Sequence, residues 1–560
     1  MSDRAVTGHP PADQETDVIV VGSGAAGMTA AILAHDNGAE VVIIERTNKV
    51  GGTTAVSGGG IWIPVNHRMG ALGFSDSRAE ALTYLNQLVM GTTDPKMLET
   101  FVDTATTMIK YLEAHTPLVF DAMTATDYQP ELPGGKFGGR SMEPQPFDTN
   151  LLGEWKTRLR PPSSFSFPLT RQEAFGEYDA FYRPWLVPQD LAADRMMKGI
   201  VTIGQALAAG LLKAVLDRGI PILLESRVRK LLMEGDRVVG VEGEQAAGGK
   251  MSVRARAAVI LASAGFEWNP RLQAQFLPSP IESPNSPPFN EGDGLLMAME
   301  VGADLANMAE IWHYPSLMIP GETYEGRPLS RPTLAERNGP HVIWVNAGGR
   351  RFANEAANYN SLGRVFREIR TDGPVFQNLP AWAVMDSQYR AQYVLGTTMP
   401  EDRDPPWLIK ADSIEELAQK TGIDSKQLLA TVEQWNADVR GGRDSKFQKG
   451  MSRYDQSQGD KEATFPNLGT IEKAPFYAVQ IHIGALGTKG GPRTNTRAQV
   501  LHVRGQAIDG LYAVGNVAAS IMGPGYPGRG ATLGPGMTFG YIAGIEAARE
   551  AKRLAPKVQR

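Results

Sequence analysis

A glycine pattern near the N-terminus constrains the fold of this chain more than any other feature of its sequence. Residues 18–21 form a short apolar run, and Gly22, Gly24 and Gly27 follow it with the spacing G-x-G-x-x-G. A run of this kind suits a strand that is buried on both faces. The alanine-rich stretch 28–37 predicts a helix directly after the glycines. We therefore expect a strand, a tight turn and a helix, which together begin a βαβ unit.

The same pattern predicts a binding site for the pyrophosphate of a dinucleotide. The first glycine makes the tight turn, the second lets a pyrophosphate approach the backbone, and the third lets the helix pack closely on the strand. Ala25 and Ala26 stand where the helix N-terminus faces the anion. Residues 41–44 predict a second parallel strand, and Glu45 after it is placed to accept hydrogen bonds from a ribose diol. A purely structural glycine turn is the alternative.

A second loop distinguishes between the dinucleotides. Residues 46–64, RTNKVGGTTAVSGGGIWIP, are rich in glycine and hydroxyl side chains, whereas an NAD-binding domain would normally continue into its third strand. This arrangement resembles the FAD-binding dehydrogenases of the fumarate reductase and succinate dehydrogenase flavoprotein family, in which the loop lies along the flavin and its diphosphate. The resemblance implies FAD as the cofactor, with contacts from Arg46, Gly52, Thr53, Thr54, Ser57, Gly58 and Gly59.

The composition excludes several other classes of protein. The chain of 560 residues has no cysteine and a net charge of -5. The lack of cysteine excludes a disulfide framework, a thiolate metal site, a cysteine nucleophile and flavin attachment through sulfur, so we expect non-covalent FAD and no metal. The mild negative charge gives no indication of nucleic acid as a partner. With no apolar signal core and no window of ~18 apolar residues, we expect a cytoplasmic enzyme, and a peripheral membrane contact stays open.

The nucleotide-binding sheet is expected to be discontinuous in sequence. Residues 201–244 predict a helix, a strand and a hairpin. Residues 257–270 predict a buried strand that ends in a small-residue turn with Gly265, and residues 510–523 predict another apolar strand that ends at Asn516. In the flavoprotein family that the chain resembles, such segments return the chain to the nucleotide and to the flavin.

These segments together predict an α/β fold with two domains. We expect a Rossmann-like FAD-binding domain over residues 1–310 and 490–560, interrupted by an α+β capping domain at 311–489 that carries catalytic residues. An aromatic-rich insertion at 150–191 belongs to the first part. The length agrees with this division, because it exceeds what a single core usually holds.

Two stretches of the chain argue against a dicarboxylate substrate. Residues 346–363 resemble the family block G-x-R-F-x-N-E, and in the fumarate-reducing branch an arginine five residues after the asparagine donates a proton. Tyr359 stands at that position in this sequence. Residues 484–495 resemble a segment in which a histidine grips a substrate carboxylate, and Gly487 takes its place. We therefore expect neither fumarate nor succinate as the substrate.

The stretch around Tyr526 carries the most specific resemblance. Residues 526–544, with Y-P-x-x-G followed by a glycine-rich helix start, resemble the signature of the 3-ketosteroid Δ1-dehydrogenases. Tyr359 in NEAANYN and Tyr128 in DYQPELPGG also fit that group. The resemblance implies that the Tyr526 hydroxyl and the Gly530 N–H bind the C3 ketone oxygen of a 3-ketosteroid.

The resemblance also implies roles for the remaining site residues. Tyr359 takes the C2 proton, Tyr128 is its hydrogen-bonding neighbour, and the C1 hydride passes to flavin N5. Since an ordinary tyrosine has a pKa near ~10, Tyr359 needs help from a neighbour to act as a base. Thr532 and Leu533 begin a helix whose N-terminus stabilises negative charge on the flavin.

Other functions stay open at this point. Most tyrosines fill cores and interfaces, so only the family context distinguishes these three among the 15 tyrosines of the chain. The runner-up function is that of a 3-ketosteroid Δ4-(5α)-dehydrogenase, with the same ketone clamp and a differently placed base. A reductase of an unsaturated acid and a non-catalytic FAD-binding module are the further alternatives.

The segment 150–191 has two interpretations. As an amphipathic element it would contact lipid and help to extract a sterol-like substrate, and as a cover it would close the active site or pack at a subunit interface. We expect an electron acceptor such as a quinone, and we leave the oligomeric state and the C17 side-chain preference open. Its aromatic residues are Trp155, Phe165, Phe167, Phe175, Phe181, Tyr182 and Trp185.

Overall fold

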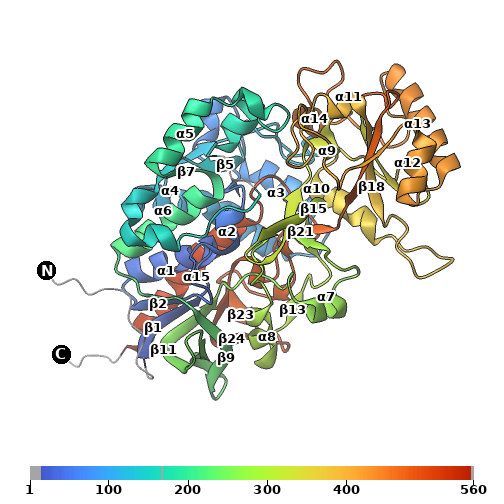
Figure 1. Cartoon of the computed structure of the whole chain (residues 1–560). Coiled ribbons are helices and arrows are strands. Elements are labelled where there is room, and N and C mark those ends of the chain that lie inside the picture. The colour runs from blue at the N-terminus through green and yellow to red at the C-terminus, as the bar shows by residue number, and fades with distance from the viewer. Residues whose placement is uncertain (1–13, 165–167, 556–560) are drawn as a thin grey trace.

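The computed structural model describes residues 14–164 and 168–555. Within them the chain builds a large α/β part, coloured blue, green and red in Figure 1, and a smaller part in yellow and orange that projects from it. The aromatic residues Phe165 and Phe167 lie outside the described residues.

Eight strands form the sheet of the large part: β1 (Gln14–Val21), β2 (Val41–Ile44), β8 (Ile222–Leu223), β9 (Ser226–Glu234), β10 (Arg237–Gln245), β11 (Lys250–Leu261), β23 (Gln499–Leu501) and β24 (Ala507–Ala513). Their order is β23-β24-β10-β11-β1-β2-β8, and β9 pairs with β10. β1 is parallel to β2 and to β11, which is parallel to β24. The carboxyl ends of these parallel strands therefore meet at one edge, where α/β proteins bind nucleotides. The predicted α/β fold is confirmed.

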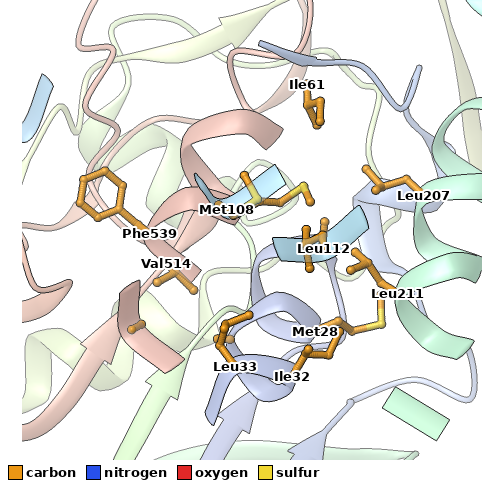
Figure 2. Close-up of a cluster of buried hydrophobic side chains, with 14 of the residues drawn as sticks. Met28, Ile32, Leu33, Ile61, Met108, Leu112, Leu207, Leu211, Val514 and Phe539 are labelled. Carbon is orange, nitrogen blue, oxygen red and sulfur yellow. The ribbon is translucent and has the colours of Figure 1, made fainter. Parts of the chain in front are cut away.

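Helices α1 (Ala25–Asp36) and α15 (Leu533–Leu554) lie on one face of this sheet, and α6 (Ile203–Asp217) and α4 (Pro95–His115) pack against these two helices. Val18 and Val20 face these helices, whereas Ile19 and Val21 face a second core on the other side, as expected for a strand buried on both faces. Figure 2 shows part of the helix-side core, which brings together side chains from distant segments: Met28, Ile32, Leu33, Met108, Leu112, Leu207, Leu211, Val514 and Phe539.

Small residues let α1 and α15 pack backbone against backbone. A Cβ atom at Gly540 would lie 2.5 Å from the carbonyl oxygen of Ala26, and one at Gly544 would lie 2.3 Å from that of Ala30. Larger residues would push the two helices apart. Because of this close packing, α1 and α15 are fixed relative to one another in the large part, although they lie far apart in the sequence (Figure 1).

The remaining elements of the large part cover its flanks. The sheet β3-β5-β4 lies beside α15 and α6, and the pair β6–β7 also lies beside α6. These short elements are α2 (Gly52–Val56), β3 (Ile61–Trp62), α3 (Arg78–Leu88), β4 (Phe120–Ala122), β5 (Ser141–Pro144), β6 (Phe147–Asp148), α5 (Gln189–Lys198), β7 (Ile200–Val201), α7 (Pro270–Phe276) and α8 (Asp293–Glu300).

The smaller part is built on the antiparallel sheet β17-β18-β20-β19, whose strands are β17 (Val342–Asn346), β18 (Ala381–Asp386), β19 (Ile409–Ala411) and β20 (Phe476–Ile481). Helices α12 (Ile414–Thr421) and α13 (Ser425–Arg440) bury their apolar faces against it. A buried ion cluster, in which Arg351 binds Glu355 and Asp444, fixes the segment that leads to Tyr359. The short helices here are α9 (Ala335–Asn338), α10 (Tyr359–Leu362), α11 (Ser387–Arg390) and α14 (Arg453–Gln458).

Neighbouring strands connect the two parts. β14 (Ile311–His313) and β21 (Gly484–Thr488) pair with each other, so that Ile311 lies opposite Thr488. The chain thus enters and leaves the smaller part side by side. The expected boundaries at 311 and 489 stay a prediction. The other strands of this region are β12 (Ser283–Pro284), β13 (Leu305–Ala306), β15 (Ser316–Tyr324), β16 (Arg327–Pro332) and β22 (Gly491–Pro492).

No helix within residues 14–164 and 168–555 has both the length and the apolar composition needed to cross a bilayer. In the aromatic segment, Trp155 and Tyr182 are buried and the rings of Phe175 and Phe181 lie 4.1 Å apart, whereas Trp185 is exposed. Phe175 and Phe181 pack with Leu169, Ala174 and Val187 in a small core that belongs to the segment, whereas Trp155 and Tyr182 pack into the cores of the large and the smaller part.

Candidate active site

A long cavity joins the glycine loop of the large part to the first residues of the smaller part. One end is lined by Gly22, Glu45 and the loop that follows β2, and the other end by Tyr128, Tyr359 and Tyr526. Segments from the whole length of the chain therefore contribute to one cavity, which has a nucleotide end and a tyrosine end.

Two positions in the glycine loop have no room for a side chain. Gly22 has φ +111°, and a Cβ atom there would lie 2.4 Å from the carbonyl oxygen of Ala262. A Cβ atom at Gly27 would lie 2.2 Å from the carbonyl oxygen of Gly22. Because α1 begins at Ala25, its N-terminal N–H groups and the positive end of its dipole face the cavity, which suits a pyrophosphate.

The carboxylate of Glu45 is held at the nucleotide end of the cavity. It is buried and accepts hydrogen bonds from the Ser23 hydroxyl, at 2.6 Å, and from the Thr47 hydroxyl, at 3.0 Å. Arg46 also lines the cavity, but its guanidinium donates to the carbonyl oxygen of Phe289 and to Glu291. Glu45 is thus fixed where a ribose would lie, and Arg46 ties the loop to a neighbouring segment.

The second loop lines the cavity beside the glycine loop. Thr54 accepts a hydrogen bond from the N–H of Ala25 at 3.0 Å, which joins the two loops, and Thr53 accepts one from Asn290 at 2.9 Å. Of the cofactor-binding residues expected from the sequence, the following line the cavity: Gly22, Gly24, Ala25, Ala26, Glu45, Arg46, Gly52, Thr53, Thr54, Ser57, Gly58, Gly59, Asn516, Thr532 and Leu533.

Two expected cofactor residues do not line the wall of this cavity in the described part of the chain. Gly27 packs α1 against the loop, as the glycine pattern requires. Gly265 lies beside Thr488, whose hydroxyl would be 2.2 Å from a Cβ atom there, and its neighbours Ala262, Ser263 and Ala264 line the cavity instead. Gly265 therefore shapes the turn behind the wall. The remaining residues fit an FAD, because they combine a glycine cradle, a helix N-terminus and a carboxylate in one groove.

Three tyrosines meet at the other end of the cavity. The Tyr128 hydroxyl donates to the Tyr359 hydroxyl at 2.5 Å. The ring of Tyr526 stacks on that of Tyr128 at 5.1 Å and meets that of Tyr359 edge-on at 5.4 Å. All three side chains are buried, and they come from a loop after β4, from the start of α10 and from the turn before α15. The structure brings together the tyrosines that the sequence singled out.

Two further tyrosines complete this cluster, and sequence reasoning missed both. Tyr314 stacks on Tyr359 with the ring centroids 4.1 Å apart, and Tyr454 meets Tyr128 edge-on at 5.1 Å. Both line the cavity. Neither Tyr314 in IWHYPS nor Tyr454 in SRYDQ has a distinctive sequence context.

The turn that carries Tyr526 is held from several sides. The buried ammonium of Lys489 donates to the carbonyl oxygens of Gly523 and Gly525 at 3.1 and 2.8 Å. The N–H of Tyr128 and the hydroxyl of Tyr84 both donate to the carbonyl oxygen of Pro527, at 2.9 and 2.8 Å. The turn and the Tyr128 loop are therefore locked together, which fixes the spacing of their two phenols.

Glycine is the only residue type that fits at position 530. It has φ +94°, and a Cβ atom there would lie 2.4 Å from the backbone of Gly60 and Ile61. Its carbonyl oxygen accepts from the N–H of Trp62 at 3.1 Å, and no group in the described part of the chain accepts from its own N–H. This N–H is available to a ligand on the same side of the cavity as Tyr526.

Burial controls the protonation of the phenols. It raises the pKa of Tyr359 well above its usual value, and the neighbouring phenols of Tyr128 and Tyr526 raise it further. Burial likewise raises the pKa of Tyr128, and it raises the pKa of Tyr526 to about 12. The hydroxyls are therefore neutral hydrogen-bond donors at neutral pH, and Tyr359 must lose its proton before it can accept another.

Three arginines line the tyrosine end of the cavity, and sequence reasoning did not single them out. Arg337 donates to the carbonyl oxygen of Ala357, two residues before Tyr359. Arg529 lies next to Gly530 in the chain and donates to Gln458 at 2.6 Å. Arg171, from the aromatic segment, is the third. Arg529 stands within the Y-P-x-x-G pattern itself, and this position could have marked it as a residue of the site.

Known proteins resemble this chain over almost its whole length. The model of the FAD binding domain family matches residues 17–533. A 4-oxocyclohexanecarboxylate 2-dehydrogenase of Sinomonas cyclohexanicum is 38% identical, with 96% of this chain and 93% of that protein covered. A 3-oxosteroid 1-dehydrogenase of Mycolicibacterium smegmatis is 37% identical, with 96% and 98% covered. The 3-ketosteroid Δ1-dehydrogenase of Sterolibacterium denitrificans has a similar structure, with a TM-score of 0.90, 36% identity, and 96% and 100% of the two chains covered.

Proposed function

The chain belongs to the FAD-binding flavoprotein family that includes the 3-oxosteroid 1-dehydrogenases, and from this premise we propose that it introduces the C1–C2 double bond into a 3-ketosteroid. It is an FAD-dependent oxidoreductase, as the sequence predicted. The observation that carries the proposal is the position of Tyr526 and the Gly530 N–H beside the Tyr128–Tyr359 pair, in the cavity that also contains the nucleotide loops.

FAD has a defined place in this proposal. The glycine loop and the N-terminus of α1 would hold the pyrophosphate, Glu45 the ribose, and the loop 52–59 would lie along the flavin. The chemistry that bound FAD supplies is the acceptance of a hydride at N5. The N-terminus of α15, at Thr532 and Leu533, would favour negative charge next to it.

The ketone clamp is the first step of the proposed mechanism. The Tyr526 hydroxyl and the Gly530 N–H would both donate to the C3 carbonyl oxygen. Because negative charge grows on this oxygen as the C2 proton leaves, two fixed donors stabilise the transition state more than the ground state. The high pKa of Tyr526 suits this role, since a neutral phenol can donate.

The second step is the removal of hydrogen from C1 and C2. Tyr359 would accept the C2 proton, and Tyr128 would stabilise the Tyr359 phenolate through the hydroxyl pair at 2.5 Å. The hydride leaves C1, and the C1–C2 double bond forms from the electron pair of the broken C2–H bond. The steroid thereby loses two electrons and two hydrogens.

The choice of ring bond has one close alternative. A Δ4-(5α)-dehydrogenase would use the same clamp and remove hydrogen from C4 and C5. The relative from Sinomonas carries a different substrate in its name, 4-oxocyclohexanecarboxylate, which is also a ring ketone. The Δ1-dehydrogenase, the Δ4-(5α)-dehydrogenase and the relative from Sinomonas would therefore share one chemistry, which is desaturation of a ring that carries a ketone.

Anaerobic flavin reduction tests the proposal. We expect androst-4-ene-3,17-dione to bleach the flavin of the holoenzyme and to yield the 1,4-diene, identified by mass spectrometry and NMR. The matched variant Tyr526→Phe should bind FAD normally and reduce it at least about 10²-fold more slowly. If dithionite reduces the flavin but no ring ketone bleaches it, this function is rejected. A product with a C4–C5 double bond, formed from a 5α-steroid, would favour the alternative.

We propose in addition a cytoplasmic enzyme that passes its electrons to a quinone and meets the membrane surface through its aromatic segment. Support comes from exposed apolar side chains at and next to this segment: Trp185, Leu186, Met196 and Met197. Apolar side chains in such a cluster suit the lipid interface. Flotation with anionic vesicles tests the contact, with Trp185→Ser and Met197→Ser as variants. An unchanged distribution between variant and parent would reject it, and light scattering on the same samples gives the oligomeric state.

A further inference from the structure

The side chain of Arg529 connects three segments that meet at the tyrosine end of the cavity. Its Nη2 donates to the Oε1 of Gln458 at 2.6 Å, and its guanidinium carbon lies 4.3 Å from the centroid of the Phe175 ring. Arg529 belongs to the turn before α15, Gln458 is the last residue of α14 in the smaller part, and Phe175 belongs to the aromatic segment. A guanidinium suits such a place, because its edge donates hydrogen bonds while its flat face can lie on an aromatic ring.

Gln458 is held from its other sides as well. Its backbone carbonyl oxygen accepts a hydrogen bond from the Tyr182 hydroxyl at 2.8 Å, and its Nε2 donates to the Ser457 hydroxyl at 2.9 Å. A glutamine amide has one oxygen that accepts and one nitrogen that only donates. Since a guanidinium also only donates, the amide oxygen is the atom that must face Arg529. The neighbours of Gln458 therefore present a fixed acceptor to Arg529.

The Phe175 ring is held from both parts of the protein. The Lys461 ammonium in the smaller part donates to the carbonyl oxygen of Phe175 at 2.9 Å, and the Phe175 ring lies 4.1 Å from that of Phe181. Earlier in the segment, the N–H of Gln172 donates to the carboxylate of Glu143 in the large part at 2.9 Å. The aromatic segment therefore bridges the two parts beside Arg529.

The peptide group between Arg529 and Gly530 carries the N–H of the proposed ketone clamp. This group packs on the flavin loop, where a Cβ atom at Gly60 would lie 3.8 Å from the Arg529 carbonyl and from the Gly530 nitrogen. A peptide group is planar, so its N–H turns only when the backbone on either side of it turns. Glycine offers little resistance to such a rotation. Contacts of the Arg529 side chain therefore add a restraint that Gly530 itself does not supply.

We propose that Arg529 and Gln458 are positioning residues that hold the Gly530 N–H in the direction of the ketone oxygen. The bonded pair and the Phe175 ring form what we call the arginine clasp. Because Gln458 and Phe175 are held by the smaller part, the ketone clamp is complete only when the two parts and the aromatic segment have come together. The inference rests on the proposed function, since it concerns the clamp of the same reaction.

The arginine clasp should act on the rate more than on the binding of the substrate. A fixed donor stabilises the negative charge that grows on the ketone oxygen, and a donor that can turn away loses part of this effect. Arg529→Met keeps the length of the side chain and removes its donors, and Gln458→Leu removes the acceptor. With androst-4-ene-3,17-dione, we expect each variant to lower kcat at least about tenfold and to change KM less than about threefold. FAD should bind at the parental stoichiometry.

Three further variants separate the arginine clasp from a general loss of stability. The double variant Arg529→Met/Gln458→Leu should be no slower than the slower single variant, because both changes break the same hydrogen bond. Gln458→Glu keeps an acceptor and should retain most of kcat. Gln456→Leu makes the same change elsewhere in α14, where the side chain binds the carbonyl oxygen of Gly450 at the surface, and should leave kcat unchanged. A parental kcat in Arg529→Met or in Gln458→Leu overturns the proposal, and so do losses that add up in the double variant.

Hydrogen exchange tests the arginine clasp without the reaction. The holoenzyme and its variants are incubated in heavy water, and peptides that cover residues 523–533 are analysed by mass spectrometry. We expect faster exchange there in Arg529→Met and Gln458→Leu than in the parent and in Gln456→Leu, because a turn that is held less firmly opens more often. Faster exchange in an enzyme that oxidises no ring ketone supports the clasp and rejects the proposed function. Parental exchange in both variants overturns the clasp, and the proposed function stands if 3-ketosteroids are still oxidised.

Discussion

The hydroxyl of Tyr128 lies 2.5 Å from the hydroxyl of Tyr359, although the two residues are 231 positions apart in the chain. Tyr128 belongs to the large part and Tyr359 to the smaller part, so the pair forms only when the two parts come together. Because the Tyr128 hydroxyl donates in this short hydrogen bond, it would stabilise negative charge on the Tyr359 oxygen after Tyr359 has lost its proton. This contact is the most direct link between the fold and the proposed chemistry.

Removal of either hydroxyl should slow the reaction to different extents. We expect Tyr359→Phe to reduce the rate of anaerobic flavin reduction about 10²- to 10⁴-fold, because the proposed mechanism assigns the C2 proton to the Tyr359 oxygen. Tyr128→Phe should cost less, since the acceptor remains and only its partner is lost. Stopped-flow absorbance of the flavin measures both rates. A Tyr359→Phe enzyme within a few-fold of the parent would exclude this residue as the base.

The rate of flavin reduction should rise with pH. A base must be unprotonated to act, and burial holds the pKa of Tyr359 well above its usual ~10. The active fraction therefore increases up to and beyond about pH 10, and the Tyr359→Phe enzyme should lack this increase. The stability conferred by the neutral buried phenols is present below the unfolded pKa near ~10 and is lost as pH rises beyond it. The rate of flavin reduction is therefore measured immediately after a jump to high pH, before the protein unfolds. A plateau already at pH 7 would contradict this assignment.

Gly530→Ala should damage the site through a steric clash. A Cβ atom there would lie 2.4 Å from the backbone of Gly60 and Ile61, so the Gly530 N–H must move away from the position that the proposal gives it. Gly505→Ala is a matched control, because Gly505 has nearly the same φ, +93° against +94°, and nothing lies within 4 Å of its Cβ position. Both variants share the backbone penalty of about 1 kcal/mol, seen by chemical denaturation. Only Gly530→Ala should lose flavin reduction, and equal losses in both variants would count against the clamp.

Lys489 should act as a positioning residue for Tyr526. Its buried ammonium donates to the carbonyl oxygens of Gly523, Pro524 and Gly525, and it lies 4.2 Å from the centroid of the Trp312 ring. Lys489→Met keeps the length but removes the donors, so we expect a lower Tm and a kcat that falls more than KM rises. Lys489→Arg should restore part of the loss. An unchanged kcat in Lys489→Met, at a temperature where it is folded, would contradict the positioning role.

Local sequence is enough to predict the nucleotide half of the protein. Gly22, Gly24 and Gly27 act within a short stretch, and the clash of a Cβ atom at Gly27 with the carbonyl oxygen of Gly22, at 2.2 Å, shows why only glycine serves at position 27. The position of Glu45 directly after β2 follows from the length of one βαβ unit. Such features lie close together in sequence and space, so a pattern of residue types determines them.

The tyrosine end depends on the tertiary structure in a different way. Tyr128, Tyr359 and Tyr526 were recognised from family motifs, but neither a motif nor a periodicity pointed to Tyr314, Tyr454, Arg171 or Arg337. These side chains come from loops and short helices of both parts. The hydrogen bonds that the Lys489 Nζ donates to Gly525 and that the Pro527 carbonyl oxygen accepts from the Tyr128 N–H hold the Tyr526 turn and the Tyr128 loop in place.

Strand patterning and glycine geometry act over short distances, so the amino-acid sequence was enough to predict the α/β frame and the FAD, and family motifs in it pointed to three phenols. Only the tertiary structure decided which charges share the cavity with those phenols. The energy of a cation depends on its burial and on its neighbours in space, and neither can be read from its place in the chain.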